Sequence, residues 1–304
     1  MFYQGLDEFL DGATTFLREG IAAGEPALVV VGSEKIDALR AELGQDAAQV
    51  QFADMAAVGE NPARIIPAWQ RFTSQNLRPG QTVRGIGEPI YPERSPAELI
   101  ECQGHETLLN VAFDDGPPWR LLCPYDTAAL PPDVINEAKR SHPYLTHHGR
   151  YTTSDIYVAQ HPSPARWDQP LPPAPRGTPA HTVGKDGHTL AELRGVIRRH
   201  ASQAGLDDLT TGRLLTAACE VATNALTHGG GTAVLQLWQD NSTLLCDVHN
   251  DGYLDATPLL GRQQPTAGQP SGRGMWLTHQ LCDLVQIRTG PSGTTIRLHI
   301  KIDN

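Results

Sequence analysis

Two polar residues with the potential for chemistry, Glu220 and Asn224, stand four positions apart in a segment of mostly small and apolar residues. On a helix, residues with this spacing lie one above the other on a single face. The apolar residues that would seat such a helix in a core are Leu215, Ala218, Val221, Ala222 and Ala225. A carboxylate and a carboxamide offer the hard oxygen ligands that magnesium prefers, whereas the alternative is an ordinary solvated helix face.

Two later segments carry glycines at positions that could complete a site. Residues 243–249 read as a strand that ends in Asn250-Asp251-Gly252, and Gly272-Arg273-Gly274 opens a short helix over residues 275–283. A glycine-rich segment that begins a helix offers free backbone N–H groups and the positive end of the helix dipole. The pattern therefore predicts an anion-binding site at this helix.

The elements that must position these residues are visible in the hydrophobic pattern. Residues 294–302 alternate apolar and polar side chains, which predicts a strand with one buried face. In the front half, residues 2–20 read as an amphipathic helix, and residues 27–31 form a continuous apolar run that a helical pattern follows. A fully buried strand with helical crossovers predicts a parallel α/β sheet. Asn61-Pro62 marks a helix start, with asparagine as the cap.

The length of 304 residues predicts two domains of ordinary size. Their border lies in a proline-dense stretch over residues 161–179, which is typical of a semi-stiff extended spacer. We therefore expect a first domain over residues 1–150, a linker over 151–184 and a second domain over 185–304.

Composition narrows the class of partner and the compartment. A formal net charge of −10 argues against nucleic acid, because neutralising phosphates dominates such binding. Five widely spaced cysteines do not make a disulfide framework. The sequence contains neither a signal-peptide pattern nor an apolar run that would span a bilayer. We therefore expect a soluble, cytoplasmic protein with no nucleic-acid or membrane partner.

The order of parts in the back half resembles the GHKL ATPase fold, an α+β two-layer architecture. The shared order is a helix with Glu220 and Asn224, a strand ending at Asn250, a glycine-rich loop, a helix, and a strand opening near Thr294. The segment 272–288 is especially similar to the anti-sigma-factor serine kinases and related actinobacterial regulators. The resemblance covers residues 185–304 and implies a protein serine/threonine kinase that uses ATP and Mg²⁺.

The resemblance also implies roles for single residues on the helix and the loop. Glu220 would be the general base that activates a serine hydroxyl on a partner protein. Asn224 would hold the magnesium ion, and Gly272, Arg273 and Gly274 would wrap the phosphates.

The adenine end of the site departs from the family pattern. Gly252 would sit under the base and Thr294 would reach its edge, but the adenine-reading aspartate of the family falls on Asn250, with Asp251 beside it. An asparagine accepts a hydrogen bond as a neutral partner, and charged hydrogen bonds are roughly twice as strong as neutral ones. We therefore expect weaker nucleotide binding than is usual for the family.

The front half, over residues 1–145, resembles the MEDS sensory domain, a distant relative of RecA-like α/β folds. The matching segments are 61–69, 84–90, 105–110 and 122–126. The sequence contains no Gly-x-x-x-x-Gly-Lys-Ser/Thr phosphate loop. The resemblance implies sensing or protein contact, with a small-molecule ligand as one input, and not ATP hydrolysis.

Three functions compete at this stage. The first is an anti-sigma-type kinase in which Glu220 activates a serine on an antagonist protein. The second is a catalytically silent module on the same fold that sequesters a sigma factor or another regulator. The third, compatible with either, is a sensor in which the front domain governs the back one. A homodimer is a further expectation for partners.

Two more groups of residues have metal-ligand chemistry. Cys102, His105 and Glu106 would share one helix face, but the sequence shows no second Cys/His pair at a matching spacing. A buried thiol and an ordinary hydrogen-bonded histidine are the favoured interpretation. The neighbours His147 and His148 are interpreted as surface residues.

Overall fold

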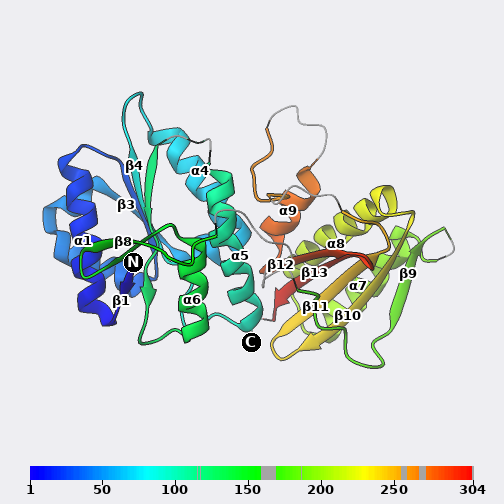
Figure 1. Ribbon diagram of the computed structural model, residues 1–304. Coiled ribbons are helices and arrows are strands. Elements are labelled where there is room, and N and C mark those ends of the chain that lie inside the picture. The colour runs from blue at the N-terminus through cyan, green and yellow to red at the C-terminus, as the bar shows by residue number, and fades with distance from the viewer. Residues whose placement is uncertain are drawn as a thin grey trace. The chain divides into compact units, whose positions relative to one another are not determined.

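The computed structural model describes residues 1–114, 116, 118–158, 169–185, 187–254, 259–266 and 272–302. The chain divides into two compact units, Met1–Trp167 and Asp168–Asn304. Figure 1 shows a mixed α/β unit and a unit built on one twisted sheet. Within the described ranges, no helix combines the length and the apolar character needed to cross a membrane.

The first unit contains the expected parallel sheet, with strand order β3-β2-β4-β5 and every neighbouring pair parallel. All five residues of β2 are buried, which explains its uninterrupted apolar sequence. The strands of this sheet are β2 (Ala27–Val31), β3 (Val50–Asp54), β4 (Val83–Gly87) and β5 (Trp119–Leu122).

A second small sheet in this unit has the strand order β6-β1-β7-β8. The prediction of a helix from residue 2 is wrong at its start. Strand β1, Phe2–Tyr3, pairs in parallel with both β6 and β7 and is not part of the first helix. The helix begins at Gly5 instead. The strands are β1 (Phe2–Tyr3), β6 (Tyr125–Asp126), β7 (Tyr144–His147) and β8 (Arg150–Thr153).

Side-chain caps begin α3, α5 and the 3₁₀ turn η2 in the first unit. Asn61 Oδ1 accepts a hydrogen bond from Ala63 N at 3.1 Å, and Ser95 and Glu98 form a reciprocal capping box. The helices are α1 (Gly5–Ala22), α2 (Ser33–Leu43), α3 (Met55–Gly59), α4 (Ile65–Asn76), α5 (Pro96–Ala112) and α6 (Pro132–Ser141), with 3₁₀ turns η1 (Gly44–Gln49) and η2 (Pro62–Arg64).

The second unit is an antiparallel sheet with the order β12-β13-β11-β10-β9, and its core lies between one sheet face and the helices. The strands are β9 (Ala180–Gly184), β10 (Thr232–Asp240), β11 (Thr243–Asn250), β12 (Leu284–Gly290) and β13 (Gly293–Lys301). The helices are α7 (Leu190–Gln203), α8 (Asp208–His228) and α9 (Arg273–Leu281).

The opposite face of this sheet carries a buried ion pair. Arg297 donates to both carboxylate oxygens of Asp247, at 2.7 and 2.8 Å, and its guanidinium lies over the Trp238 ring. Arg297 also donates to Pro172 O at 2.7 Å. Part of the segment expected to be a linker is therefore packed against the sheet, and residues 180–184 of that segment form the edge strand β9.

Candidate functional site

Helix α8 presents Glu220 and Asn224 on successive turns. It begins where Asp207 Oδ1 accepts from Thr210 N at 2.7 Å, and its buried side faces the core. Leu214 lies fully inside the core, whereas Leu215, which the sequence placed in the apolar stripe, is only partly buried against it. Glu220 and Asn224 are half-buried beside this stripe.

A cavity of about 280 Å³ lies between α8, the end of β11 and the start of α9. Six of the residues expected to bind nucleotide line it together: Asn224, Asn250, Gly252, Gly272, Gly274 and Thr294. The remaining walls are largely apolar, as in many small-molecule pockets. The structure thus brings together residues that lie on four separate segments of the sequence: α8, the end of β11, the start of α9 and the start of β13.

Glu220 and Arg273 line a neighbouring, more open hollow instead. Gly274 borders both the hollow and the cavity. A Cβ atom at Gly274 would lie 2.7 Å from Glu220 Oε2 and 3.5 Å from Asn224 Nδ2, so only glycine fits without displacing a side chain. The two polar residues of α8 therefore meet at the backbone of Gly274, one facing each space.

The start of α9 is suited to an anion. Gly272 holds the position before the helix with φ 88° and ψ −4°, a left-handed conformation that glycine adopts readily. Among the residues that the structure describes, no side chain caps the helix at this end. The first N–H groups of α9 are therefore available to an acceptor at the mouth of the cavity.

The loop after β11 is held by side chains of the site itself. Asn250 Oδ1 accepts from Gly252 N at 2.9 Å, so one lone pair of the carboxamide is already engaged. Thr294 is buried, donates to Gly252 O at 2.8 Å and accepts from Leu254 N at 3.2 Å. The Thr294 hydroxyl thus fixes the loop, in addition to lining the cavity.

Asp251 lies apart from the cavity. Its side chain is 95% exposed and approaches His249 at 3.8 Å. The structure therefore does not bring Asp251 together with the other expected cofactor residues.

The cavity also includes residues that the sequence reasoning missed. His228 follows Asn224 by four positions on α8 and shares its face, a spacing that could have identified it. Tyr253, Leu254, Leu260, Met275 and Ile296 also line the cavity. No local sequence signal identifies these apolar residues, because they reach the cavity through loops and through the packing of separate elements.

In the first unit, charged side chains lie at the carboxyl ends of the parallel strands, where open α/β sheets commonly bind ligands. Glu88, directly after β4, accepts from Lys35 Nζ at 2.7 Å and from Tyr3 OH at 2.6 Å. Burial raises the pKa of the Glu88 carboxyl, although the Lys35 ammonium opposes this shift. The charges at this edge are therefore engaged with each other.

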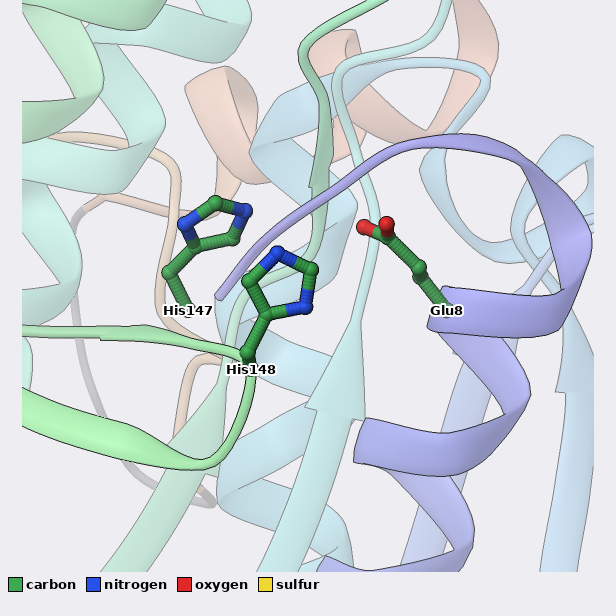
Figure 2. Close-up of side chains that lie close together, drawn as sticks. All are labelled: Glu8, His147 and His148. Carbon is green, nitrogen blue, oxygen red and sulfur yellow. The ribbon is translucent and has the colours of Figure 1, made fainter.

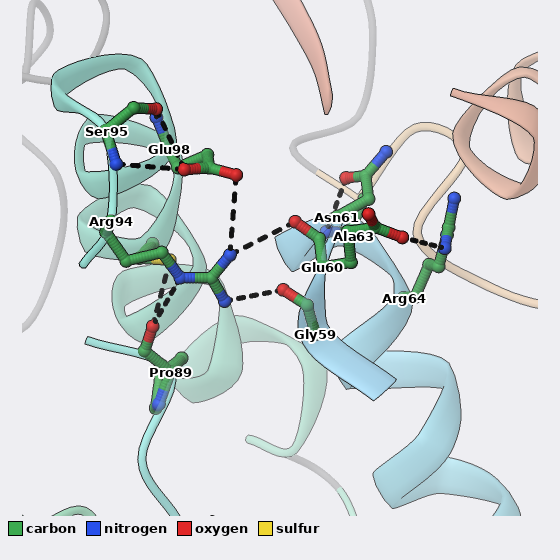
Figure 3. A network of polar contacts seen from close by, with 10 residues as sticks. Gly59, Glu60, Asn61, Ala63, Arg64, Pro89, Arg94, Ser95 and Glu98 are labelled. Carbon is green, nitrogen blue, oxygen red and sulfur yellow. Dashed lines mark hydrogen bonds and ion pairs between the residues drawn. The ribbon is translucent and has the colours of Figure 1, made fainter. Parts of the chain in front are cut away.

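Arg94 binds backbone groups of two segments that follow strands of the same sheet, as Figure 3 shows. Its guanidinium donates to Pro89 O at 3.0 Å, to Glu60 O at 3.1 Å and to Gly59 O at 2.6 Å. Glu98 lies 3.9 Å away and completes the charge balance. Arg94 thus joins the segments that follow β3 and β4, and it acts as an internal cross-link.

Cys102 and Glu106, which the sequence offered as metal ligands on one helix face, contact different groups in the structure. Cys102 donates to Pro89 O at 3.3 Å, and burial raises the pKa of its thiol to about 12. Glu106 instead faces His142, with Nε2 and Oε2 at 3.2 Å, and lies near Cys123. Cys102 therefore behaves as the buried thiol that the sequence favoured.

Comparisons with known proteins identify the type of each half. Residues 1–143 match the family described as MEDS, the MEthanogen/methylotroph, DcmR Sensory domain. Residues 185–300 match the family described as Histidine kinase-like ATPase domain. No curated protein matches the chain.

Two solved structures are similar to part of the chain. The RsbU and RsbW domains of Rv1364c from Mycobacterium tuberculosis are 18% identical with a TM-score of 0.30, covering 41% of this chain and 32% of that one. The Acinetobacter baumannii histidine kinase AdeS is 12% identical with a TM-score of 0.28, covering 42% and 69%. The matched part therefore spans about a third of the Rv1364c chain.

An ATPase domain implies a site for ATP, and the cavity at Gly274 lies within the matched residues. The chain joins a MEDS sensory domain to a GHKL-like, histidine kinase-like ATPase domain.

Proposed function

We propose that the second domain is an ATP- and Mg²⁺-dependent kinase that phosphorylates a serine of an antagonist protein, under the control of the MEDS domain. The observation that carries this proposal is the meeting of two spaces at Gly274. One is a cavity of about 280 Å³ lined by Asn224, and the other is an open hollow lined by Glu220. A nucleotide in the first and a protein hydroxyl in the second would face each other across this backbone.

The residues of the cavity suit ATP. Its apolar walls and the second lone pair of Asn250 Oδ1 suit an adenine, and the uncapped start of α9 suits phosphate oxygens. The close approach of Gly274 to α8 leaves backbone where a side chain would block the passage between the two spaces. Asn224 offers a carboxamide oxygen to a magnesium ion that keeps most of its waters.

When bound, ATP supplies the phosphoryl group and Mg²⁺ neutralises the charge on its oxygens. Glu220 accepts the proton of the serine hydroxyl as the serine oxygen bonds to the γ-phosphorus. The bond from that phosphorus to the β–γ bridging oxygen breaks, and its electron pair leaves with ADP. The N–H groups at the start of α9 and the Arg273 side chain hold the phosphate oxygens in place.

A second function, a silent module that sequesters a sigma factor, is favoured by one observation. Asn250 stands at the adenine-reading position as a neutral residue, and its Oδ1 is already shared with Gly252 N. A neutral, partly engaged acceptor lowers nucleotide affinity. Such a module would bind its partner with or without ATP.

The proposal extends to the remaining features of the protein. The first domain would be a RecA-like sensor without a phosphate loop, over residues 1–150, and residues 151–184 would join it to the kinase. Its input would be a small molecule. Regulation of a sigma factor, as in actinobacterial regulators, implies a cytoplasmic protein, because transcription occurs there. Pairing with a second copy would complete the assembly.

The assay that separates the two functions is transfer of labelled γ-phosphate to a panel of serine-bearing antagonist proteins, run beside a sigma-factor pull-down. A kinase labels at least one antagonist, and the label is stable to acid as a serine ester. Pull-down of a sigma factor without transfer to any antagonist would favour the silent module instead.

A further inference from the structure

Glu8, His147 and His148 converge on the surface of the MEDS domain. Glu8 lies on α1, His147 ends β7 and His148 occupies the turn that follows. One ligand atom from each residue lies within 4.8 Å of the other two. Figure 2 shows the two imidazole rings side by side, with Glu8 extending toward them from its helix.

Local structure holds these side chains in place. Phe2 of β1 pairs with His147 in the parallel ladder, so the end of β7 lies beside the chain that enters α1. Glu8 Oε2 accepts from Gln4 N at 2.8 Å, which orients the carboxylate and leaves Oε1 for another partner. The site therefore lies on two elements that are joined by strand pairing.

The backbone at His148 is unusual for a residue with a side chain. His148 has φ 46° and Gly149 has φ 71°, and they connect the paired residues His147 and Arg150. These values describe a type I′ turn, in which glycine, asparagine or aspartate are preferred at both central positions. His148 thus holds a left-handed conformation that few residues other than glycine adopt, and this conformation sets the direction of its side chain.

The surroundings favour a cation. A cavity of about 320 Å³ is lined by Glu8, His148 and three further carboxylates, Asp7, Asp11 and Glu19. Among the described residues that line it there is no lysine or arginine, and burial lowers the pKa of the Met1 ammonium, which also belongs to the lining, to about 6. Glu19 pairs with Arg84 at 3.2 Å, so the negative charge of this lining comes from Asp7, Glu8 and Asp11.

We propose that Glu8, His147 and His148 bind a divalent ion of the zinc class. Two imidazole nitrogens and one carboxylate oxygen are a ligand set that zinc accepts, with water in the fourth position. Magnesium and calcium prefer oxygen ligands throughout, so two imidazoles select against them. The bound ion joins α1 to the β7–β8 hairpin and stabilises the MEDS domain.

A second group, Glu106, Cys123 and His142, has metal-ligand chemistry in the same domain. Here the Glu106 carboxylate already faces His142 at 3.2 Å, and burial raises the pKa of the Cys123 thiol. An ion would have to displace the Glu106–His142 contact and the proton of the Cys123 thiol. This buried group serves as the competing site in the test.

The test is titration of the full chain with Zn²⁺ against a chelating dye, without nucleotide or Mg²⁺. Wild type should bind one ion, and added Zn²⁺ should raise its Tm. His148→Gly removes the ring and relaxes the turn, so the variant should fold and bind Zn²⁺ more than about 100-fold more weakly, since even outer-shell changes cost 10–100-fold. Glu8→Gln keeps an acceptor for Gln4 N and should show a loss in the same direction.

Two matched variants and one spectrum complete the design. His188→Asn changes a histidine of the other domain, and Cys123→Ser changes the buried group; both should bind Zn²⁺ as the wild type does. Bound Co²⁺ should lack a thiolate charge-transfer band. Binding that survives His148→Gly and Glu8→Gln, that is lost in Cys123→Ser, or that shows this band would overturn the proposal, as would a wild type that binds no Zn²⁺.

Discussion

The two domains differ in whether the polar side chains at their candidate ligand sites already have partners within the protein. In the MEDS domain, Glu88 after β4 is bound by Lys35 and Tyr3, and Arg94 donates to three backbone carbonyl groups. In the ATPase domain, the side chains of Glu220 and Asn224 have no hydrogen bond or ion pair with any residue that the structure describes.

This difference distinguishes polar residues that stabilise the fold from polar residues that are available to bind a ligand. A buried charge that is satisfied internally stabilises a fold and has little left to offer a ligand. Half-buried polar groups that face a cavity without a partner are available to a substrate. We therefore propose the cavity of the ATPase domain as the nucleotide site, and a structural role for the polar edge of the MEDS sheet.

The largest effect is expected where the proposed base is neutralised. Glu220→Gln keeps the size of the side chain but cannot take a proton from a serine hydroxyl. A positioned base supplies about 10²–10⁴-fold in rate, so phosphotransfer should fall by that factor while ATP affinity stays unchanged. Single-turnover transfer and ATP titration measure the two quantities; a variant with undiminished transfer would contradict the assignment.

Removing the partner of the buried Glu88 carboxylate should destabilise the MEDS domain without affecting the nucleotide site. Lys35→Met leaves the Glu88 carboxylate buried without its cation, which typically costs about 3–5 kcal/mol of folding free energy. Chemical denaturation measures this loss. The double variant Lys35→Met/Glu88→Gln should recover much of it, whereas equal losses in both would mean that packing dominates.

The pH dependence of this variant has a defined sign. Burial holds the pKa of folded Glu88 above its ordinary value of 4.5, so protonation is favoured in the folded state. Stability contributed by this carboxyl is present below the unfolded pKa and is lost as the pH rises through the folded pKa. Without Lys35 the folded pKa rises further, and the destabilisation of Lys35→Met should be smaller near pH 4 than at neutral pH.

A smaller effect is expected at the glycine between the two spaces. The Cβ atom of Gly274→Ala would lie 2.7 Å from Glu220 Oε2, the movable end of a side chain, so the protein should fold with its carboxylate displaced. Misplacement by about 1 Å can cost up to about 100-fold in rate. The control is Gly212→Ala on α8, the helix that carries Glu220, where a Cβ meets no atom within 4 Å and transfer should be unchanged.

The smallest effect is expected at the adenine end. Asn250→Asp retains an acceptor for Gly252 N and adds a charge, which should tighten ATP binding by about 1–2 kcal/mol. Calorimetry of ATP binding measures the gain. Unchanged affinity would show that Asn250 serves only to shape the loop.

Several elements could be predicted from the sequence because their signals are local. The apolar run of β2, the asparagine cap at Asn61 and the shared face of Glu220 and Asn224 each depend on residues close together in the chain. The glycine pair at Gly272 and Gly274 likewise indicated the start of a helix.

Other features could not be predicted because they depend on pairing between distant segments. Strand β9 is short and forms only against β10, so its residues look like part of a proline-rich linker. The two-residue strand β1 is defined by its neighbours β6 and β7. That same pairing brings Glu8 to His148, which in sequence alone looked like an ordinary surface residue.

The central claim, that the cavity beside Asn224 binds ATP through magnesium, is tested most directly by titrating the full chain with ATP in the presence and absence of Mg²⁺. The account predicts one site per chain, stronger binding with Mg²⁺ in the wild type, and no gain from Mg²⁺ in Asn224→Ala. ATP binding with the same Mg²⁺ dependence in Asn224→Ala, or no ATP binding by the wild type, would contradict it.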